Sequence, residues 1–221
     1  MRTFDCEILN TSFKLQAPFA LLISGSSGAG KTKFIENILR HDKIDISPKT
    51  IYYHYPPELN TIPVKWHNLF PSLNIKYIQG LPDETEWNQV RPNSLVIIDD
   101  MYVECVNSEA ASKAFKIYSK KRNFSIILVS QFFFDRGTYS STIRNNIEYF
   151  TLFENHGNMS MNRMIAEKLG YIKRYKEAAK TAYDKRHGYV LISVSSKVPT
   201  SKLRVCCNFF GENNTYPSFF N

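Results

Sequence analysis

The sequence lacks any apolar run that approaches the length of a membrane-spanning helix, so we expect no helical membrane span. Cysteine is also scarce: four are spread along the chain, none in C-x-x-C spacing, and the adjacent pair Cys206-Cys207 is a poor metal site and a poor disulfide. Residues 1–16 are too mixed for a signal peptide. We therefore expect a protein that is not secreted and keeps reduced thiols in a cytosolic or nuclear setting.

Positive charge prevails over negative charge. Lys and Arg number 28, and Asp and Glu number 20, which gives a formal charge of +8. That sign favours polyanionic partners, chiefly nucleic acid. The chain of 221 residues, with 43% hydrophobic and 22% charged residues, is typical of one globular domain rather than a disordered chain. The five histidines have no ligand spacing, so we expect no metal site beyond Mg²⁺.

Apolar segments alternate with segments of helical periodicity, which predicts an α/β fold with a mostly parallel central sheet and helices on both faces. We expect a single domain over residues 1–221, with an N-terminal extension over 1–15 and a C-terminal tail over 211–221. The expected helices are Lys31–Arg40, Ser108–Lys121 and Met159–Tyr183. The expected strands are Phe19–Ser24, Thr50–Tyr55, Lys76–Gln79, Ser94–Ile98, Ser125–Ser130, Ile147–Phe153 and Gly188–Val194.

A glycine-rich segment joins the first expected strand to the first expected helix. Residues 25–32, "GSSGAGKT", fit the pattern G-x-x-x-x-G-K-[ST] of a phosphate-binding loop. Such a loop turns successive N–H groups toward an anion at a helix N-terminus. We expect Lys31 to reach the β- and γ-phosphates of ATP and Thr32 to ligate Mg²⁺. The expected nucleotide-binding residues are Gly25, Ser26, Ser27, Gly28, Ala29, Gly30, Lys31, Thr32 and Lys33.

An apolar strand that ends in two acids follows the phosphate loop by 68 residues, counted from Lys31 to Asp99. We assign Asp99 to Mg²⁺, held directly or through water. Asp100 is then placed to orient and deprotonate an attacking water, with Glu104 as the alternative base. At least one strand, "TIYYHY", lies between the two motifs. This extra strand resembles the arrangement of RecA-like ATPases rather than that of simple kinases.

Two further side chains complete the candidate catalytic set. Gln131 follows the expected strand Ser125–Ser130, and the carboxyl ends of parallel strands face the ligand crevice. Its amide is suited to hold the attacking water or to contact the γ-phosphate. Arg144 lies in a polar segment before the next strand, where an arginine could reach a neighbouring subunit's site as an arginine finger. Arg136 is the competing candidate for this role.

Two tracts concentrate positive charge. Residues 113–122 carry five positive charges and no acid, and residues 163–186 carry eight positive and three negative charges. On a helix, Lys173, Arg174, Lys176 and Lys180 would share a broad face with Tyr171 and Tyr175 between them. Basic residues interleaved with aromatic ones suit contact with a phosphate backbone, although each tract equally fits the solvated face of an amphipathic helix.

The segments "GSSGAGKT", "VIIDDMY", "AFKIYSKKRNFSIILVSQFFF", "IRNNIEYFTLFEN" and "HGYVLISVSSKVPTSKLRV" occur in this order along the chain. Together they resemble the genome-packaging ATPases of the FtsK–HerA superfamily, the poxvirus-type packaging ATPases of large DNA viruses, virophages and Polinton-like elements. The resemblance covers about residues 15–210. It departs from many relatives at Lys120-Lys121, before Arg122-Asn123, and at Gln131-Phe132.

The resemblance implies a RecA-like P-loop ATPase that assembles into a homo-oligomeric ring, a pentamer or a hexamer. It implies ATP and Mg²⁺ as cofactors and movement of double-stranded DNA into a capsid. The expected partners are therefore DNA, further copies of the chain and a capsid or portal-vertex protein, with no membrane. The expected location is the virion or a viral assembly site in the host cell. Two other functions stay open: a small-molecule kinase for nucleosides or nucleotides, and a nucleotide-gated interaction protein with little hydrolysis.

Overall fold

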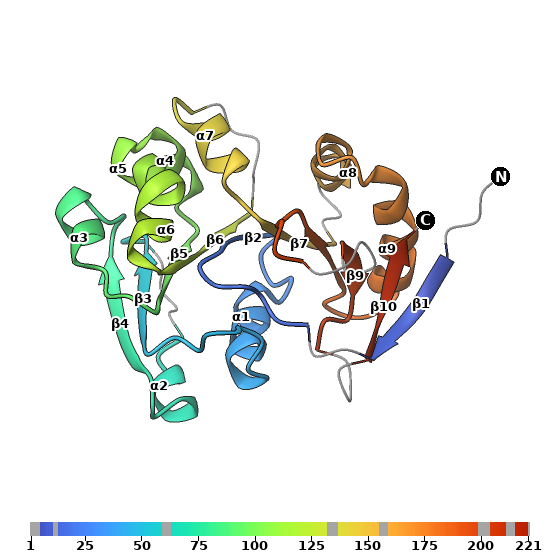
Figure 1. The fold of residues 1–221 in the computed structure, drawn as a ribbon, viewed down its shortest axis with the longest axis horizontal. Helices are drawn as coiled ribbons and strands as arrows, with labels where there is room; N and C mark the ends of the chain where they lie inside the picture. Colours follow the sequence, from blue (N-terminus) through green and yellow to red (C-terminus); the bar gives the residue numbers. More distant parts are fainter. Residues whose placement is uncertain are drawn as a thin grey trace. The chain divides into compact units, whose positions relative to one another are not determined.

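A computed structural model of the chain describes residues 5–10, 13–58, 63–131, 137–154, 159–198, 204–210 and 215–220. The chain forms two compact units, each assembled from separated stretches of sequence (Figure 1). The phosphate-loop unit comprises Met1–Lys14, Ile23–Lys43 and Glu148–Asn221. The acidic-strand unit comprises Leu15–Leu22 and Ile44–Ile147. The boundary falls inside strand β2 (Ala20–Ser24), so the sequence motif for phosphate and the acidic motif belong to different units.

The acidic-strand unit is built on parallel strands, as the sequence predicts. β3 (Thr50–Tyr55) pairs with β4 (Asn74–Gln79) on one side and with β5 (Ser94–Asp99) on the other, and β6 (Ser125–Ser130) pairs with β5. β3, β5 and β6 are buried along nearly their whole length, in keeping with the near-continuous apolar runs of parallel strands. The backbone N–H of Ile126 in β6 donates to the carbonyl of Phe19, 2.8 Å away, just before β2.

Helices of the acidic-strand unit lie mostly on one side of these strands (Figure 1). The helix expected over Ser108–Lys121 is one continuous helical segment whose middle third winds as a π-helix, which widens the turn around buried Phe115. The short helices were not anticipated, because four to six residues give too little periodicity to detect. The helical elements are α2 (Trp66–Leu69), α3 (Glu84–Gln89), α4 (Tyr102–Asn107), α5 (Glu109–Lys113), η1 (Ala114–Tyr118), α6 (Ser119–Arg122) and α7 (Ser140–Asn145).

The phosphate-loop unit has antiparallel strands, which the sequence analysis did not anticipate. Its strand order is β1-β10-β9-β8-β7, and neighbouring strands in this order pair antiparallel. Residues 215–220, expected in a loose tail, form a strand that pairs along its whole length with a strand in the expected N-terminal extension. The strands are β1 (Asp5–Asn10), β7 (Tyr149–Phe153), β8 (Tyr189–Ser193), β9 (Val205–Cys207) and β10 (Thr215–Phe220).

The helices of this unit are α1 (Lys31–Arg40), α8 (Met159–Lys168) and α9 (Ile172–Tyr183). The single helix expected over Met159–Tyr183 was wrong, because Gly170 adopts a left-handed φ of 75° and ends α8. The N–H of Tyr171 then donates to the carbonyl of Ala166, 2.7 Å away, in the manner of a glycine helix cap. The core of the unit forms where Phe34 of α1 packs edge-on against Phe153 and Tyr189. No helix in the described ranges is both long and apolar enough to cross a bilayer.

Candidate functional site

The loop between β2 and α1 has the backbone that an anion-binding turn requires. Gly28 and Gly30 adopt left-handed φ values of 76° and 103°, which glycine reaches without a steric penalty. At Gly25 an added β-carbon would lie 2.7 Å from Cβ of Phe153, so only glycine allows the loop to pack this closely against β7. The sequence "GSSGAGKT" therefore specifies both the curl of the loop and its contact with the neighbouring strand.

The loop's charged side chains lie in different places. The Lys31 ammonium donates to the carbonyls of Gly25 and Ser26, at 2.7 and 2.8 Å, and so lies back over the loop. Thr32 is exposed at the first turn of α1. The Lys33 ammonium pairs with Glu36, a carboxylate only 2% exposed that also accepts from Arg40 at 3.0 Å. Lys31 and Thr32 thus lie at the start of α1, beside the loop, while Lys33 supports the helix behind it.

A cavity of about 190 Å³ adjoins the tip of the loop. Its floor and walls come from the loop itself, from the end of β7 and from the turn that precedes β8. Nothing in the sequence placed Glu154 or His187 beside the loop, because 120 or more residues separate them from it and neither falls in a nucleotide-binding pattern. The residues that line the cavity are Ser26, Ser27, Gly28, Ala29, Phe153, Glu154, His187 and Gly188.

In the acidic-strand unit, the two acids occupy the positions that the sequence predicts, at the carboxyl end of β5. Asp99 is half-buried and accepts a hydrogen bond from the hydroxyl of Tyr53 on β3. Burial, and then the adjacent Asp99 charge, raise the pKa of Tyr53 far above its usual range, so this hydroxyl keeps its proton. Tyr53 is a member of the candidate site that sequence reasoning missed, because the tyrosines of "TIYYHY" gave no sign of which one contacts the acid.

Asp100 and Gln131 are brought together within the same unit. The Gln131 amide donates to Oδ2 of Asp100 across 3.0 Å, and both follow neighbouring parallel strands. Asp100 is exposed and has a left-handed φ of 55°, which turns it away from the line of β5. The backbone N–H of Asp100 donates to the carbonyl of Val129, which fixes this turn. A carboxylate and an amide at this distance can together hold one water molecule.

The two arginine candidates and the alternative base have different positions. Arg144 lies half-buried in the last turn of α7. Arg136 lies outside the described residues. Glu104 is exposed in the first turn of α4, four residues after Asp100.

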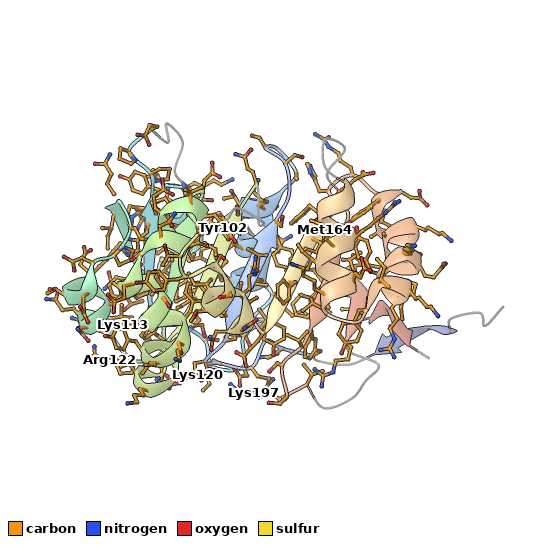
Figure 2. All side chains as sticks on the ribbon, turned by 90° about the horizontal axis from the view of Figure 1, so that it is seen from above. Tyr102, Lys113, Lys120, Arg122, Met164 and Lys197 are labelled. Atoms are coloured by element: carbon orange, nitrogen blue, oxygen red, sulfur yellow. The ribbon has the colours of Figure 1, made fainter. Side chains whose placement is uncertain are left out.

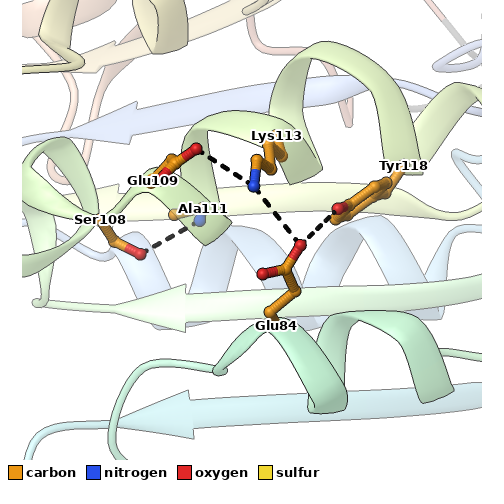
Figure 3. A network of polar contacts seen from close by, with 6 residues as sticks. All are labelled: Glu84, Ser108, Glu109, Ala111, Lys113 and Tyr118. Atoms are coloured by element: carbon orange, nitrogen blue, oxygen red, sulfur yellow. Dashed lines mark hydrogen bonds and ion pairs between the residues drawn. The ribbon is translucent and has the colours of Figure 1, made fainter.

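The first basic tract is partly neutralised by the fold. Lys113 pairs with Glu109 at 3.1 Å and with Glu84 at 3.4 Å, and the Tyr118 hydroxyl donates to the same Glu84 (Figure 3). The pKa of Lys113 is raised, first by its hydrogen bond to Glu109. Arg122 donates to the carbonyl of Asn88. Figure 2 labels Lys113, Lys120 and Arg122 on this segment. The exposed lysines that remain on it are Lys116, Lys120 and Lys121.

The second tract forms a lysine stripe on α9, defined by Lys173, Lys176 and Lys180. These residues recur at i, i+3 and i+7 and are all exposed. The expectation that Tyr175 is interleaved with them was wrong: Tyr175 is 4% exposed and, with Ala178 and Ala182, forms the opposite, buried face. Burying the aromatic ring of Tyr175 stabilises the fold more than leaving it exposed between the lysines would. Arg174 is half-buried and lies over the Tyr171 ring, 5.5 Å from its centroid.

No known family model matches the chain, and no curated protein matches it. Among solved structures, B204, the DNA-packaging ATPase from Sulfolobus Turreted Icosahedral Virus, aligns with 83% of this chain and 96% of its own, at 15% identity and a TM-score of 0.51. B204, the genome packaging NTPase from Sulfolobus turreted icosahedral virus 2, in complex with ATP-gammaS, aligns with 82% of this chain and 95% of its own, at 13% identity and a TM-score of 0.52. The likeness is one of fold: this chain has the RecA-like α/β fold of a P-loop ATPase, as its sequence predicts.

Proposed function

We propose that the chain is an ATPase that uses ATP hydrolysis to move double-stranded DNA into a viral or virus-like capsid. The observation that carries the proposal is the loop at residues 25–32. Two of its glycines, Gly28 and Gly30, have left-handed φ, its lysine lies over the loop, and it leads into α1. These are the features that a triphosphate requires: closely spaced N–H donors, a mobile cation and the positive end of a helix.

ATP binding is assigned to the phosphate-loop unit. The N–H groups of Gly25, Ser26, Ser27, Gly28 and Gly30, with those of the first turn of α1, are the proposed donors for the phosphate oxygens. The N–H of Ala29 donates to the carbonyl of Ser26 at 3.2 Å, so Ala29 shapes the loop. When ATP binds, the Lys31 ammonium gives up its hydrogen bonds to the two loop carbonyls and donates to the β- and γ-phosphates instead. Because Lys33 pairs with buried Glu36, its part in nucleotide binding is limited to its backbone N–H.

Mg²⁺ is proposed to be held by the two residues that the sequence singles out. The Thr32 hydroxyl and the Asp99 carboxylate are hard oxygen donors, and Mg²⁺ is commonly held by one or two protein oxygens together with substrate phosphates. When bound, the ion neutralises charge that develops on the transferred phosphoryl group. Tyr53 fixes the orientation of the Asp99 carboxylate, as partners of metal-binding carboxylates do.

Hydrolysis is assigned to Asp100, Gln131 and Arg144. The amide of Gln131 and the carboxylate of Asp100, 3.0 Å apart, hold the attacking water, and Asp100 accepts its proton. Arg144 is proposed to act on a neighbouring subunit's nucleotide, where its charge stabilises the transition state. This role requires a homo-oligomeric ring, as the sequence resemblance implies.

DNA is the partner that best matches the exposed charge. The lysine stripe of α9 and the lysines of the first tract are exposed, and the charge excess of the whole chain has the same sign. The fold of a DNA-packaging ATPase supports the same partner. A capsid or portal-vertex protein would dock the ring, at the virion or a viral assembly site.

The test is ATP hydrolysis by the purified chain with Mg²⁺, with and without linear double-stranded DNA, across a series of protein concentrations. We expect turnover per subunit to rise with DNA and with protein concentration. Lys31→Ala is expected to abolish hydrolysis while the circular dichroism spectrum stays unchanged, and activity that survives this change would refute the site. Turnover stimulated by a nucleoside or nucleotide acceptor, and not by DNA, would instead establish a kinase.

Arg144 is tested by mixing subunits. Arg144→Ala and Lys31→Ala subunits are each expected to be inactive alone. Mixed together, they should regain activity, because an intact Arg144 on the Lys31→Ala subunit can serve the intact phosphate loop of its neighbour. An Arg144→Ala ring with wild-type turnover would remove Arg144 from the mechanism.

A further inference from the structure

His187 contacts the phosphate loop although it lies 158 residues away along the chain. Its Nδ1 is 3.1 Å from the carbonyl oxygen of Ala29. A carbonyl oxygen can only accept, so Nδ1 carries the proton and donates. The ring also packs on the α-carbon of Gly30: a β-carbon added there would lie 3.2 Å from both Cβ and Cγ of His187. The imidazole therefore fixes one particular peptide unit, the one between Ala29 and Gly30.

That peptide unit determines where a phosphate-binding donor points. The peptide bond is planar and trans, so the carbonyl of Ala29 and the N–H of Gly30 point to opposite sides. Because His187 holds the carbonyl, the Gly30 N–H is directed away from the imidazole. Gly30 is also the last loop residue before Lys31, with a left-handed φ of 103°. A rotation of this one peptide would remove a donor from the loop.

His187 is itself held rigidly by the end of α9. The N–H of Lys185 donates to the carbonyl of Ala182 at 3.2 Å, and the N–H of Gly188 donates to the carbonyl of Lys185 at 2.9 Å. A β-carbon at Gly188 would lie 1.8 Å from the carbonyl oxygen of Ala182, so the turn folds back on the helix as tightly as glycine permits. His187 has a left-handed φ of 60°, a strained conformation that persists only where the surroundings impose it.

We propose that His187 is a positioning residue of the nucleotide site, which sets the Ala29–Gly30 peptide for phosphate binding and connects it to the C-terminal end of α9. The proposal rests on the proposed nucleotide-binding function of the same loop. It gives the turn before β8 a role that its sequence, "DKRHGY", does not reveal. It also connects the loop to the helix that carries the lysine stripe, since α9 runs directly into this turn.

The experiment compares two variants of residue 187, which distinguish the effect of its left-handed backbone from the effect of its side-chain N–H donor. His187→Gly removes the donor and tolerates the left-handed φ. His187→Asn restores an N–H donor near the position of Nδ1 and also tolerates that φ. Asp42→Gly is the matched control, because Asp42 is another exposed residue of this unit with a left-handed φ, 48°, far along α1 from the loop.

Binding of a fluorescent ATP analogue with Mg²⁺ is measured for the full chain. We expect His187→Gly to weaken binding about tenfold and to raise KM more than it lowers kcat. The reason is that a misdirected Gly30 N–H no longer donates to the phosphates, either in the bound substrate or in the transition state. His187→Asn should bind within about twofold of wild type, as should Asp42→Gly.

Equal binding by His187→Gly and wild type would overturn the proposal, and so would equal weakening by the Gly and Asn variants. Failure of the nucleotide-binding function itself has a different signature: the wild-type chain would not bind the analogue, or Lys31→Ala would bind it equally well. The two failures are therefore distinguishable in one titration series.

Discussion

The hydrogen bond from Tyr53 to Asp99 leads to a prediction about metal-dependent nucleotide binding. Tyr53 is 1% exposed, and its hydroxyl donates to the carboxylate proposed to hold Mg²⁺. Tyr53→Phe keeps the ring, its edge-on contact with Trp66 at 5.6 Å and nearly all of its volume. The substitution therefore removes the orienting hydrogen bond and little else.

The expected magnitude follows from the type of hydrogen bond. A hydrogen bond to a charged group contributes about 1.5–3 kcal/mol, and a neutral one about 0.5–1.5 kcal/mol. Asp99 is half-buried and can regain a water molecule, so we expect Tyr53→Phe to cost about 2 kcal/mol. Loss of a partner that orients a metal-binding carboxylate typically weakens metal binding by about 10–100-fold. We expect the half-saturating Mg²⁺ concentration for ATP binding to rise about tenfold.

Tyr77→Phe is the matched control. Tyr77 belongs to the same aromatic cluster, with its ring 5.6 Å from that of Tyr53, but its hydroxyl donates to the carbonyl of Pro63 at 2.7 Å. Its loss should cost about 1 kcal/mol and leave the Mg²⁺ dependence unchanged. Stability is read by urea denaturation with tryptophan fluorescence, because both tryptophans, Trp66 and Trp87, lie in the acidic-strand unit. If the two variants show the same Mg²⁺ dependence, Tyr53 does not orient a metal ligand and the reasoning fails.

Three further predictions concern the water-binding pair, the lysine stripe and the buried tyrosines. Gln131→Ala should lower kcat about 10²-fold or more while the Kd for ATP stays within a few fold, measured by steady-state hydrolysis and analogue binding, because its amide is proposed to act on the water alone. Reversing the charge of the lysine stripe should abolish stimulation by DNA and leave DNA-free hydrolysis unchanged; stimulation that persists would exclude this stripe from DNA contact. Alkaline pH should destabilise the fold, because burial raises the pKa of Tyr53, Tyr183 and Tyr189 above the unfolded value near 10. Their contribution is fully present below pH 10 and falls above it by about 1.4 kcal/mol per pH unit for each tyrosine, which urea midpoints between pH 8 and 11 would reveal.

Much of the fold was predictable because its signals are local. The strands at Thr50–Tyr55 and Ser125–Ser130 and the helix at Lys31–Arg40 have the bounds that the sequence predicts. Long apolar runs and a strong helical period identify such elements without reference to the rest of the chain. The antiparallel pairing of β1 with β10 was not predictable, because it joins residues about 210 apart in sequence. An alternating hydrophobic pattern can indicate a strand, but it does not indicate which other strand pairs with it.

The residues of the candidate site likewise fall into two groups, those that a local sequence pattern predicts and those that only tertiary contacts bring to the site. The glycine positions, Lys31 and the two acids are predicted from spacing, since phosphate and Mg²⁺ chemistry fixes residue types in a short pattern. Tyr53 and His187 were missed, because each acts through one hydrogen bond to a distant residue and neither belongs to a pattern. The basic tract at residues 113–122 contains no acid in sequence, yet Glu84 from a separate helix neutralises part of it.

The sequence by itself therefore determined the candidates for the chemistry: a predicted phosphate loop, an acidic strand end and a glutamine after the next strand, each encoded within a few consecutive residues. Only the tertiary structure decided which groups hold that chemistry in place. Tyr53 reaches Asp99 from β3, Gln131 meets Asp100, and His187 fixes the Ala29 carbonyl. The physical reason is the distance along the chain over which each feature is specified. Loop curvature and strand formation depend mainly on neighbours in sequence. A hydrogen bond between distant residues depends on which groups meet in space with suitable geometry, and the packing of the whole chain decides that.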